Sequence, residues 1–137
     1  MRIDTRQIPQ QGMTLREEFT PDELDCAAGV CAFAGPLSVE ADVSKITNAL
    51  TVKLRLRGCL RMTCGRCLKE FDEECDKQLV LNYRVDASRP VICLDPDIRE
   101  ELILGYPINP LCHPGCRGLC ARCGKNLNEG GCSCGTT

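Results

Sequence analysis

Cysteine is concentrated in the C-terminal part of this chain. Of 13 cysteines in 137 residues, six lie in one short segment, as Cys112, Cys116, Cys120, Cys123, Cys132 and Cys134. One further pair, Cys64 and Cys67, lies upstream with two residues between its members. Thiols at such spacings form disulfides, bind a metal or carry out redox chemistry. The choice among these three outcomes largely decides what the protein can do.

The cellular compartment separates disulfides from metal binding. The N-terminal sequence has no positively charged start followed by an apolar run, and no segment approaches the ~20 apolar residues of a membrane span. We therefore expect a cytoplasmic protein, and disulfides do not persist in a reducing cytosol. An odd number of cysteines, 13, also cannot pair completely. Metal ligation is favoured, although export or an oxidising cytosol would restore the disulfide interpretation.

Zinc is the metal that this pattern favours. Zinc is held tetrahedrally by four thiolates at about 2.3 Å in structural sites. Eight cysteines fall into pairs of suitable spacing, which predicts two four-cysteine sites. We assign Cys120, Cys123, Cys132 and Cys134 to a local site, and expect Cys112 and Cys116 to reach back to Cys64 and Cys67. A single site made of Cys112, Cys116, Cys120 and Cys123 is the main alternative, and an iron–sulfur cluster uses the same ligands.

The single histidine and the other five cysteines are weaker candidates for metal ligands. His113 is the only histidine, and a loop histidine is expected to be exposed rather than a ligand. Cys75 and Cys93 lie in strand-like segments, where a buried cysteine acts as a small hydrophobic residue. Cys26, Cys31 and Cys59 offer no ligand geometry.

Alternating apolar residues predict the strands that position Cys64. The alternation covers 37–44, turns at Thr47 and Asn48, and resumes over 50–64, which predicts a hairpin. Further strands are predicted over 78–85 and 91–94. The acidic stretch 72–76 is expected to lie away from the basic face of this hairpin.

Helical signals are fewer. The segment 15–24 is helix-like, with a break near Thr20 caused by Pro21, and a short strand is expected near Ile3. One short helix is predicted to begin with a cap at Asp95 and to end near Gly105. We predict an α+β fold with a mainly antiparallel sheet, arranged as a hairpin or meander or closed like a barrel, with one or two short helices and a Cys-rich zinc-knuckle tail. Residues 1–110 form the core and 111–137 the tail of a single domain.

Charge gives a mixed signal about nucleic acid. The chain has 17 basic and 19 acidic residues, a net charge of −2, whereas nucleic-acid-binding domains are usually basic. Basic side chains nevertheless gather on one face of the 50–64 strand and around the cysteines: Lys53, Arg55, Arg57, Arg61, Arg66, Lys69, Arg117, Arg122 and Lys125. If the tail docks at Cys64 and Cys67, these groups form one surface that could follow a phosphate backbone. The alternative is an ordinary solvated strand face.

Three segments form a recognisable set: Cys64-Gly-Arg-Cys67-Leu68, the segment 98–107, and the tail motif C-x-G-L-C-x-x-C-G-x-x-L-N that starts at Cys116 and is followed by Cys132-Ser-Cys134. Together they resemble the YceD family of bacteria and plastids. The resemblance covers about residue 37 to the end. It implies a role in the synthesis, processing or stability of large-subunit ribosomal RNA, and it implies no catalytic residues.

We therefore expect a non-catalytic, zinc-stabilised ribosome-biogenesis factor. Its partner would be ribosomal RNA or a large-subunit ribosomal protein, and we expect neither a membrane nor a small-molecule substrate. A thiol redox protein using the C-x-x-C pairs is one alternative, but no β-α-β pattern surrounds either pair. A zinc-stabilised protein-interaction module without RNA contact is another. The sequence contains no Gly-rich phosphate loop.

Overall fold

The computed structural model describes residues 1–24 and 32–135. Within them the chain forms a five-stranded sheet, a two-stranded sheet and one α-helix. The larger sheet contains β2 (Met13–Phe19), β3 (Ala32–Phe33), β4 (Leu37–Ile46), β5 (Ala49–Thr63) and β6 (Glu70–Arg84). The smaller sheet pairs β1 (Arg2–Asp4) with β7 (Val91–Cys93), and α1 spans Asp95–Leu104. Every strand pair is antiparallel, so the predicted fold class is confirmed.

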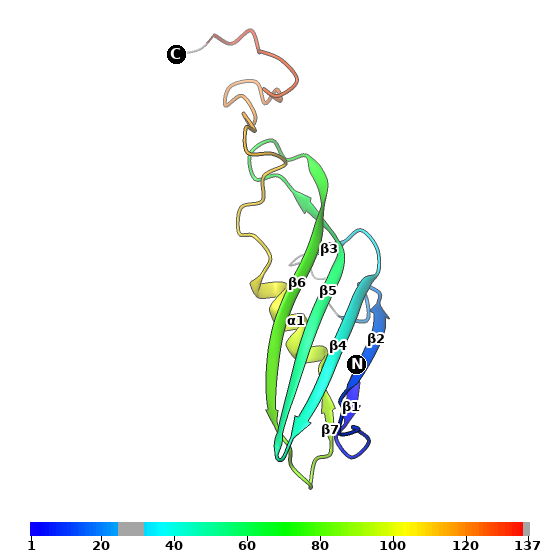
Figure 1. The fold of residues 1–137 in the computed structure, drawn as a ribbon. Helices are drawn as coiled ribbons and strands as arrows, with labels where there is room; N and C mark the ends of the chain where they lie inside the picture. The colour runs from blue at the N-terminus through cyan, green and yellow to red at the C-terminus, as the bar shows by residue number, and fades with distance from the viewer. Residues whose placement is uncertain (25–31, 136–137) are drawn as a thin grey trace.

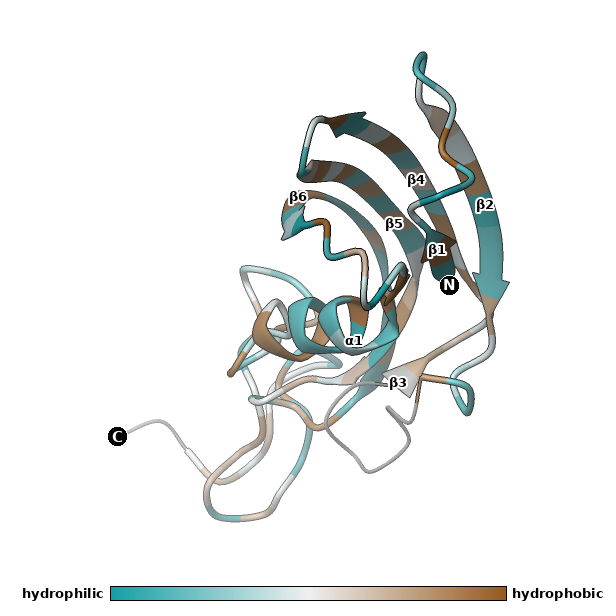
Figure 2. Cartoon of the chain, turned by 90° about the horizontal axis from the view of Figure 1, so that it is seen from below, coloured by the Kyte–Doolittle hydropathy of each residue, from teal (hydrophilic) through white to brown (hydrophobic). Residues whose placement is uncertain are grey.

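The centre of the larger sheet is the meander β4–β5–β6. Strand β5 pairs along its whole length with β6 and along its first half with β4, while the short β3 continues the β4 edge. One face is apolar because side chains alternate along each strand. Figure 2 shows this curved sheet with α1 across its hollow. The helix buries Ile98 and Leu102 in the core, so the hydrophobic core lies between sheet and helix.

Polar contacts fix α1 on the sheet. Lys77 on β6 donates from Nζ to the carbonyl of Glu101 at 3.1 Å. This carbonyl lies in the last helical turn and also accepts the N–H of the C-cap residue Gly105 at 3.0 Å. A cation is favoured at this end of a helix. At the other end of the helix, the Tyr83 hydroxyl donates to Asp97. Both ends of the helix are therefore held by β6.

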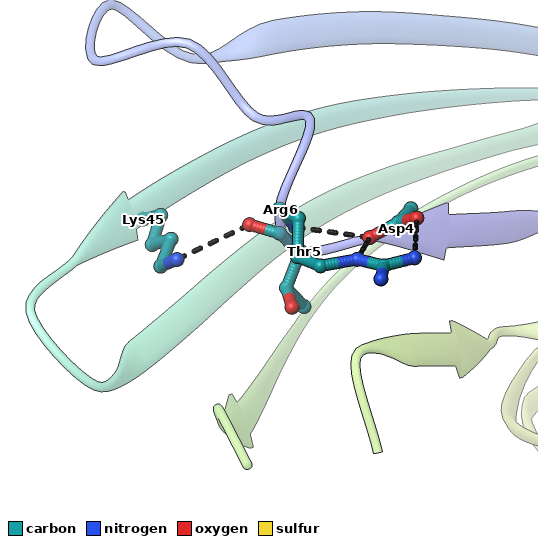
Figure 3. Close-up of polar contacts among 4 residues, drawn as sticks. All are labelled: Asp4, Thr5, Arg6 and Lys45. Atoms are coloured by element: carbon teal, nitrogen blue, oxygen red, sulfur yellow. Dashed lines mark hydrogen bonds and ion pairs between the residues drawn. The ribbon is translucent and has the colours of Figure 1, made fainter. Parts of the chain in front are cut away.

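The N-terminal segment is tied to the same sheet. Strand β1 pairs with β7, and the turn after β1 contacts the end of β4 (Figure 3). There Lys45 donates from Nζ to the carbonyl of Thr5 at 3.1 Å, and Arg6 binds the Asp4 carboxylate at 2.7 Å. Thr5 is 3% exposed, so this turn belongs to the packed part of the molecule.

Two elements differ from the sequence predictions. The helix-like segment 15–24 is strand β2 up to Phe19, because it pairs with β4 as an edge strand, and this tertiary pairing outweighs local propensity. The predicted break at Thr20 is present, since β2 ends there and a turn follows. Strand β6 begins at Glu70, eight residues before the predicted start at 78, because an exposed sheet face accepts its acidic side chains.

Smaller corrections concern the helix start and one cysteine. Leu94 is the N-cap of α1 and no side chain caps it, so Asp95 is the first helical residue. Cys93 is exposed, whereas Cys75 is buried as expected. Cys26 and Cys31 lie outside the described residues.

After α1 the chain runs back along the molecule to the β5–β6 loop and continues beyond the end of the sheet (Figure 1). The Gly65 N–H donates to the carbonyl of Pro110 at 2.8 Å, where this segment reaches the loop. The described part of this segment contains no helix or strand longer than an isolated bridge. No helix among the described residues is long and apolar enough to cross a membrane.

Candidate metal centres

The eight predicted ligands come together as two groups of four. Centre 1 contains Cys64, Cys67, Cys112 and Cys116, and centre 2 contains Cys120, Cys123, Cys132 and Cys134. Within each group the Sγ atoms all lie within 4.8 Å of one another. This is the preferred grouping from the sequence, and the structure does not bring Cys112 and Cys116 together with Cys120 and Cys123 as the alternative required. His113 is exposed and belongs to neither group.

Sulfur distances fit one tetrahedral ion in each centre. Four sulfurs at about 2.3 Å from a central ion lie ~3.8 Å apart. In centre 1, Sγ of Cys64 lies 3.7 Å from Sγ of Cys116, and Sγ of Cys67 lies 3.7 Å from that of Cys112. In centre 2 the Cys120 and Cys132 sulfurs are 3.4 Å apart. These separations exceed the ~2.05 Å of a disulfide, so the donor sets could each hold a metal.

A tight turn brings the first two sulfurs of centre 1 together. We call residues 64–69 the first knuckle. The N–H of Cys64 donates to the carbonyl of Lys69 at 2.8 Å, and the N–H of Leu68 donates to the carbonyl of Cys64 at 3.0 Å. Leu68 has φ of 59°, a left-handed conformation that is rare for residues other than glycine. The chain therefore reverses within one turn and both thiols project to the same side.

Centre 2 begins with a second copy of this turn. We call residues 120–125 the second knuckle. The N–H of Cys120 donates to the carbonyl of Lys125 at 2.8 Å, and the N–H of Gly124 donates to the carbonyl of Cys120 at 2.9 Å. Gly124 has φ of 72°, as its counterpart Leu68 does at 59°. Both knuckles have the sequence C-x-R-C-x-K, a repeat that the sequence analysis missed although the letters show it.

The turns also supply N–H donors to the sulfurs. The N–H of Cys67 lowers the pKa of the Cys64 thiol to about 5, and the N–H of Cys123 lowers the pKa of Cys120 to about 6. In centre 2, the hydrogen bond with Cys123 instead raises the pKa of Cys134 to about 12. Adjacent thiolates repel, so all four ionise together only around a cation. The donor set in each centre is thus suited to a divalent ion.

Asn128 links the two centres. It follows the second knuckle in sequence, yet its Nδ2 donates to Sγ of Cys116 in centre 1 at 3.3 Å and thereby lowers the pKa of that thiol. Its Oδ1 accepts the N–H of Arg117 at 2.8 Å. Outer hydrogen bonds of this kind orient metal ligands. The family motif ends with this asparagine, and the structure gives it a physical role.

The centres differ in burial. In centre 1, Cys64 is fully buried and Cys116 is 3% exposed, with Phe71, Leu111 and Leu119 packed around them. Cys123 of centre 2 is exposed. Centre 1 joins the β5–β6 loop to a segment 45 or more residues away in sequence, whereas centre 2 closes on itself. Centre 1 is therefore the connection between the tail and the sheet.

Comparison with known proteins agrees with these motifs. The family model described as Large ribosomal RNA subunit accumulation protein YceD matches residues 84–137. The resemblance to the YceD family is confirmed over these residues, whereas its predicted extension back to about residue 37 lies outside the match. The matched part, which we call the YceD segment, contains all of centre 2 and Cys112 and Cys116 of centre 1.

Two plant proteins are also similar to this chain. Large ribosomal RNA subunit accumulation protein YCED homolog 1, chloroplastic, from Zea mays is 32% identical over 69 residues, which is 50% of this chain and 23% of that protein. The protein of the same name from Arabidopsis thaliana is 39% identical over 44 residues, which is 32% of this chain and 14% of that protein. The chain thus spans less than a quarter of these relatives' length. No solved structure matches it.

The strand arginines upstream of the YceD segment are paired with acidic residues. Arg55 binds Asp76 at 2.7 Å, and Arg57 lies 3.6 Å from the same carboxylate. Arg61 binds Asp72 at 3.0 Å. The acidic stretch 72–76 was expected elsewhere, and that expectation is wrong because β6 pairs with β5 from Glu70 onward. Lys53 lies opposite Asp42 of β4 in the register without an ion pair to it. The three arginines of the predicted basic strand face are therefore ion-paired with β6.

The basic residues near the cysteines have no carboxylate partners among the described residues. All are exposed, and none lies within ion-pair distance of a carboxylate in the described chain: Arg66, Lys69, Arg117, Arg122 and Lys125. Several instead donate to backbone carbonyls. The guanidinium of Arg66 donates to Cys116 at 3.0 Å and that of Arg122 to Cys134 at 3.1 Å. The predicted RNA-contacting set therefore divides into strand arginines that are ion-paired and basic residues around the cysteines that are not.

Proposed function

We propose that this protein is a non-catalytic, zinc-stabilised factor that supports the accumulation of large-subunit ribosomal RNA. The observation that carries the proposal is centre 1, in which two cysteines from the β5–β6 loop and two from the YceD segment lie within 4.8 Å of one another. The names of the two plant relatives supply the ribosomal connection. The partner would be the ribosomal RNA itself or a large-subunit ribosomal protein, in the reducing cytoplasm.

The donor sets support zinc in both centres. Four thiolates complete a tetrahedral zinc site, and the sulfur–sulfur distances of 3.4 to 3.7 Å suit one ion in each centre. An iron–sulfur cluster would hold the four cysteine sulfurs farther apart, because the cluster's own core lies between them. Zinc in such a site supplies folding energy rather than chemistry. A filled tetrahedral site leaves no open position for a substrate, which supports a non-catalytic role.

Thiol redox chemistry is the second candidate. The low pKa of Cys64, about 5, and of Cys120, about 6, would favour a reactive thiolate. Both thiols, however, belong to four-sulfur groups rather than to isolated pairs. A zinc-loaded protein should react slowly with a thiol-modifying reagent at these positions, whereas a redox protein should react fast. Rapid labelling of the metal-loaded protein would favour the redox candidate.

Metal stoichiometry tests the zinc part of the proposal. Native mass spectrometry of protein purified without chelator should show two zinc ions per chain. Cys120→Ser with Cys123→Ser should leave one ion, held by centre 1, and Cys64→Ser with Cys67→Ser should leave one ion in centre 2. As a control, Cys93→Ser should keep both ions because this exposed cysteine lies outside both groups. A chain without bound metal, or with iron and sulfide, would refute the assignment.

The ribosomal part needs a cellular measurement. Depleting the protein in its host should lower large-subunit ribosomal RNA relative to small-subunit RNA. The wild-type chain should restore the ratio, and the Cys64→Ser, Cys67→Ser variant should not, because it loses the metal connection between the sheet and the tail. An unchanged RNA ratio after depletion would overturn the proposed function.

A further inference from the structure

The cysteine-rich end of the molecule has a local excess of positive charge. Residues 64–69 and 111–135 contain five lysines and arginines but one acidic residue, Glu129. The sheet face beside them is neutralised by its own ion pairs, as at Arg61 and Asp72. A chain with net charge −2 therefore has a local basic end. This asymmetry calls for an explanation beyond solubility.

The two knuckles present their arginines in the same way. Arg66 and Arg122 are each the third residue of a C-x-R-C-x-K turn. Each guanidinium donates one N–H to the backbone carbonyl of a cysteine in the other cysteine pair of its own centre. Arg66 donates to Cys116 at 3.0 Å, and Arg122 donates to Cys134 at 3.1 Å. A guanidinium held by one nitrogen keeps its other donors free and loses less freedom when it binds an anion. The repeat thus gives two preorganised anion-binding groups.

Arg117 lies between the knuckles. Its neighbour Gly118 packs on the first knuckle so closely that a Cβ there would lie 3.2 Å from the carbonyl oxygen of Arg66. Gly118 also has φ of +76°, which favours glycine. The N–H of Leu127 donates to the Gly118 carbonyl at 2.9 Å, and this joins the same point to the chain that follows the second knuckle. Cations from both knuckles are therefore carried on one connected unit.

We propose that the two knuckles and Arg117 together bind backbone phosphates of RNA, whereas the β5 strand face does not. This proposal rests on the proposed function and names the surface that would carry it. Phosphate oxygens are the anions that the guanidinium fork fits, and contacts to them position an RNA without reading its sequence. The strand arginines would have to leave Asp72 and Asp76 before they could bind a phosphate.

An acidic protein partner fits this surface less well. Stable protein interfaces have an apolar core with aromatic anchors, and the knuckles carry one large exposed apolar side chain, Leu68. Exposed aromatic residues for base stacking are equally lacking there, since the tail beyond Tyr106 contains none. Backbone phosphates are the ligand that needs neither.

A competing role for these cations is balance of the thiolate charge. Four thiolates around a divalent ion leave two negative charges in excess at each centre, and nearby cations would offset them. The two roles separate at Lys69 and Arg117, because neither side chain makes a hydrogen bond or ion pair to the described residues. Changing these two residues tests phosphate binding without removing the Arg66 or Arg122 hydrogen bond from either centre.

The test uses the full zinc-loaded chain and a fluorescently labelled RNA hairpin of mixed sequence. Lys69→Glu with Arg117→Glu should lower affinity at least tenfold, and should reduce the slope of log affinity against log salt by about 1.4 to 1.8, as expected for two lost phosphate contacts. The matched control is Arg84→Glu with Arg89→Glu. It makes the same charge change at exposed residues near the opposite end of the sheet, and should bind RNA within twofold of wild type.

Three results would overturn the proposal. First, the Lys69→Glu, Arg117→Glu variant, called here the knuckle variant, could bind RNA as tightly as wild type. Second, it could lose metal on native mass spectrometry, which would assign these cations to balancing the thiolate charge. Third, the knuckle variant and the Arg84→Glu, Arg89→Glu control could weaken RNA binding equally. Cellular complementation separates this proposal from the proposed function. If the knuckle variant restores large-subunit RNA levels, or if wild type binds no RNA yet restores them, the phosphate surface is refuted and the ribosomal role stands.

Discussion

Asn128 is the residue that makes the two cysteine centres interdependent. Its amide donates to Sγ of Cys116 at 3.3 Å and accepts the N–H of Arg117 at 2.8 Å. A neutral amide can do both, because it has a donor and an acceptor on one planar group. The side chain thus orients one ligand of centre 1 from a position that belongs to the loop of centre 2.

Replacing Asn128 should therefore weaken a centre to which it contributes no ligand. We expect Asn128→Ala to speed zinc loss from centre 1 by about 10- to 100-fold, the usual effect of removing an outer hydrogen bond to a metal ligand. Stopped-flow chelation with a chromogenic chelator measures this rate. Asn82→Ala on β6 is the control and should leave both rates unchanged. Equal zinc loss in the two variants would show that the Asn128 contact does not stabilise the centre.

Pairing of β5 with β6 decides the electrostatic character of the sheet. The register places Asp76 opposite Arg57 and Asp72 opposite Arg61. Ion pairs this exposed contribute little to stability because solvent screens them, so their main effect is on the charge that the face presents. The same register brings Lys77 to the C-terminal end of α1.

Neutralising the acidic partners of the strand arginines should create an RNA-binding face. We expect Asp72→Asn with Asp76→Asn to raise affinity for an RNA hairpin several-fold at low salt and to steepen the salt dependence, because Arg55, Arg57 and Arg61 lose their carboxylate partners. Thermal unfolding should show only a small loss of stability, because exposed ion pairs are screened by solvent. Glu73→Gln with Glu74→Gln makes the same charge change without breaking a described ion pair. If the two double variants gained the same RNA affinity, the ion pairs to Asp72 and Asp76 would not be what keeps the strand arginines from binding RNA.

The molecule has two parts that are stabilised differently. The sheet and α1 share an extensive apolar core, which includes Leu50, Leu54 and Ile98. The apolar cluster of the tail is small and is built around Cys64, Cys67 and Cys116. A segment with so little apolar burial needs a cross-link to hold one conformation. We propose that metal supplies that cross-link, and the boundary at residue 110 between core and tail stays a prediction.

Metal removal should then unfold the tail and spare the sheet. After treatment with a strong chelator under reducing conditions, we expect far-UV circular dichroism to retain the strand signal. Trypsin should cut first after Arg117, Arg122 and Lys125, and adding back zinc should restore protection. Cleavage within β5 at the same rate would mean that the metal stabilises the whole chain. Resistance of the chelated tail would mean that its form does not depend on metal.

Local spacing predicted much of this fold and of the candidate site. Alternation over 37–44 and 50–64 predicted β4 and β5, because a strand with one buried face needs that period. Helical spacing predicted α1 from Ile98 and Leu102. The strand β2 was missed because its residues have no strong alternation and form an edge strand only by pairing with β4. The early part of β6 was missed because its side chains on the exposed sheet face are acidic.

By itself, the sequence determined the apolar face of the hairpin, the cysteine pairs and the family resemblance, because each depends on residues a few positions apart. Only the tertiary structure decided which strand residues face the arginines, since the pairing of β6 with β5 sets every cross-strand neighbour at once. It also decided that Asn128 reaches Cys116, and that the two C-x-R-C-x-K turns present their arginines alike. Contacts of this kind depend on the path of the chain in space, which residue spacing does not specify.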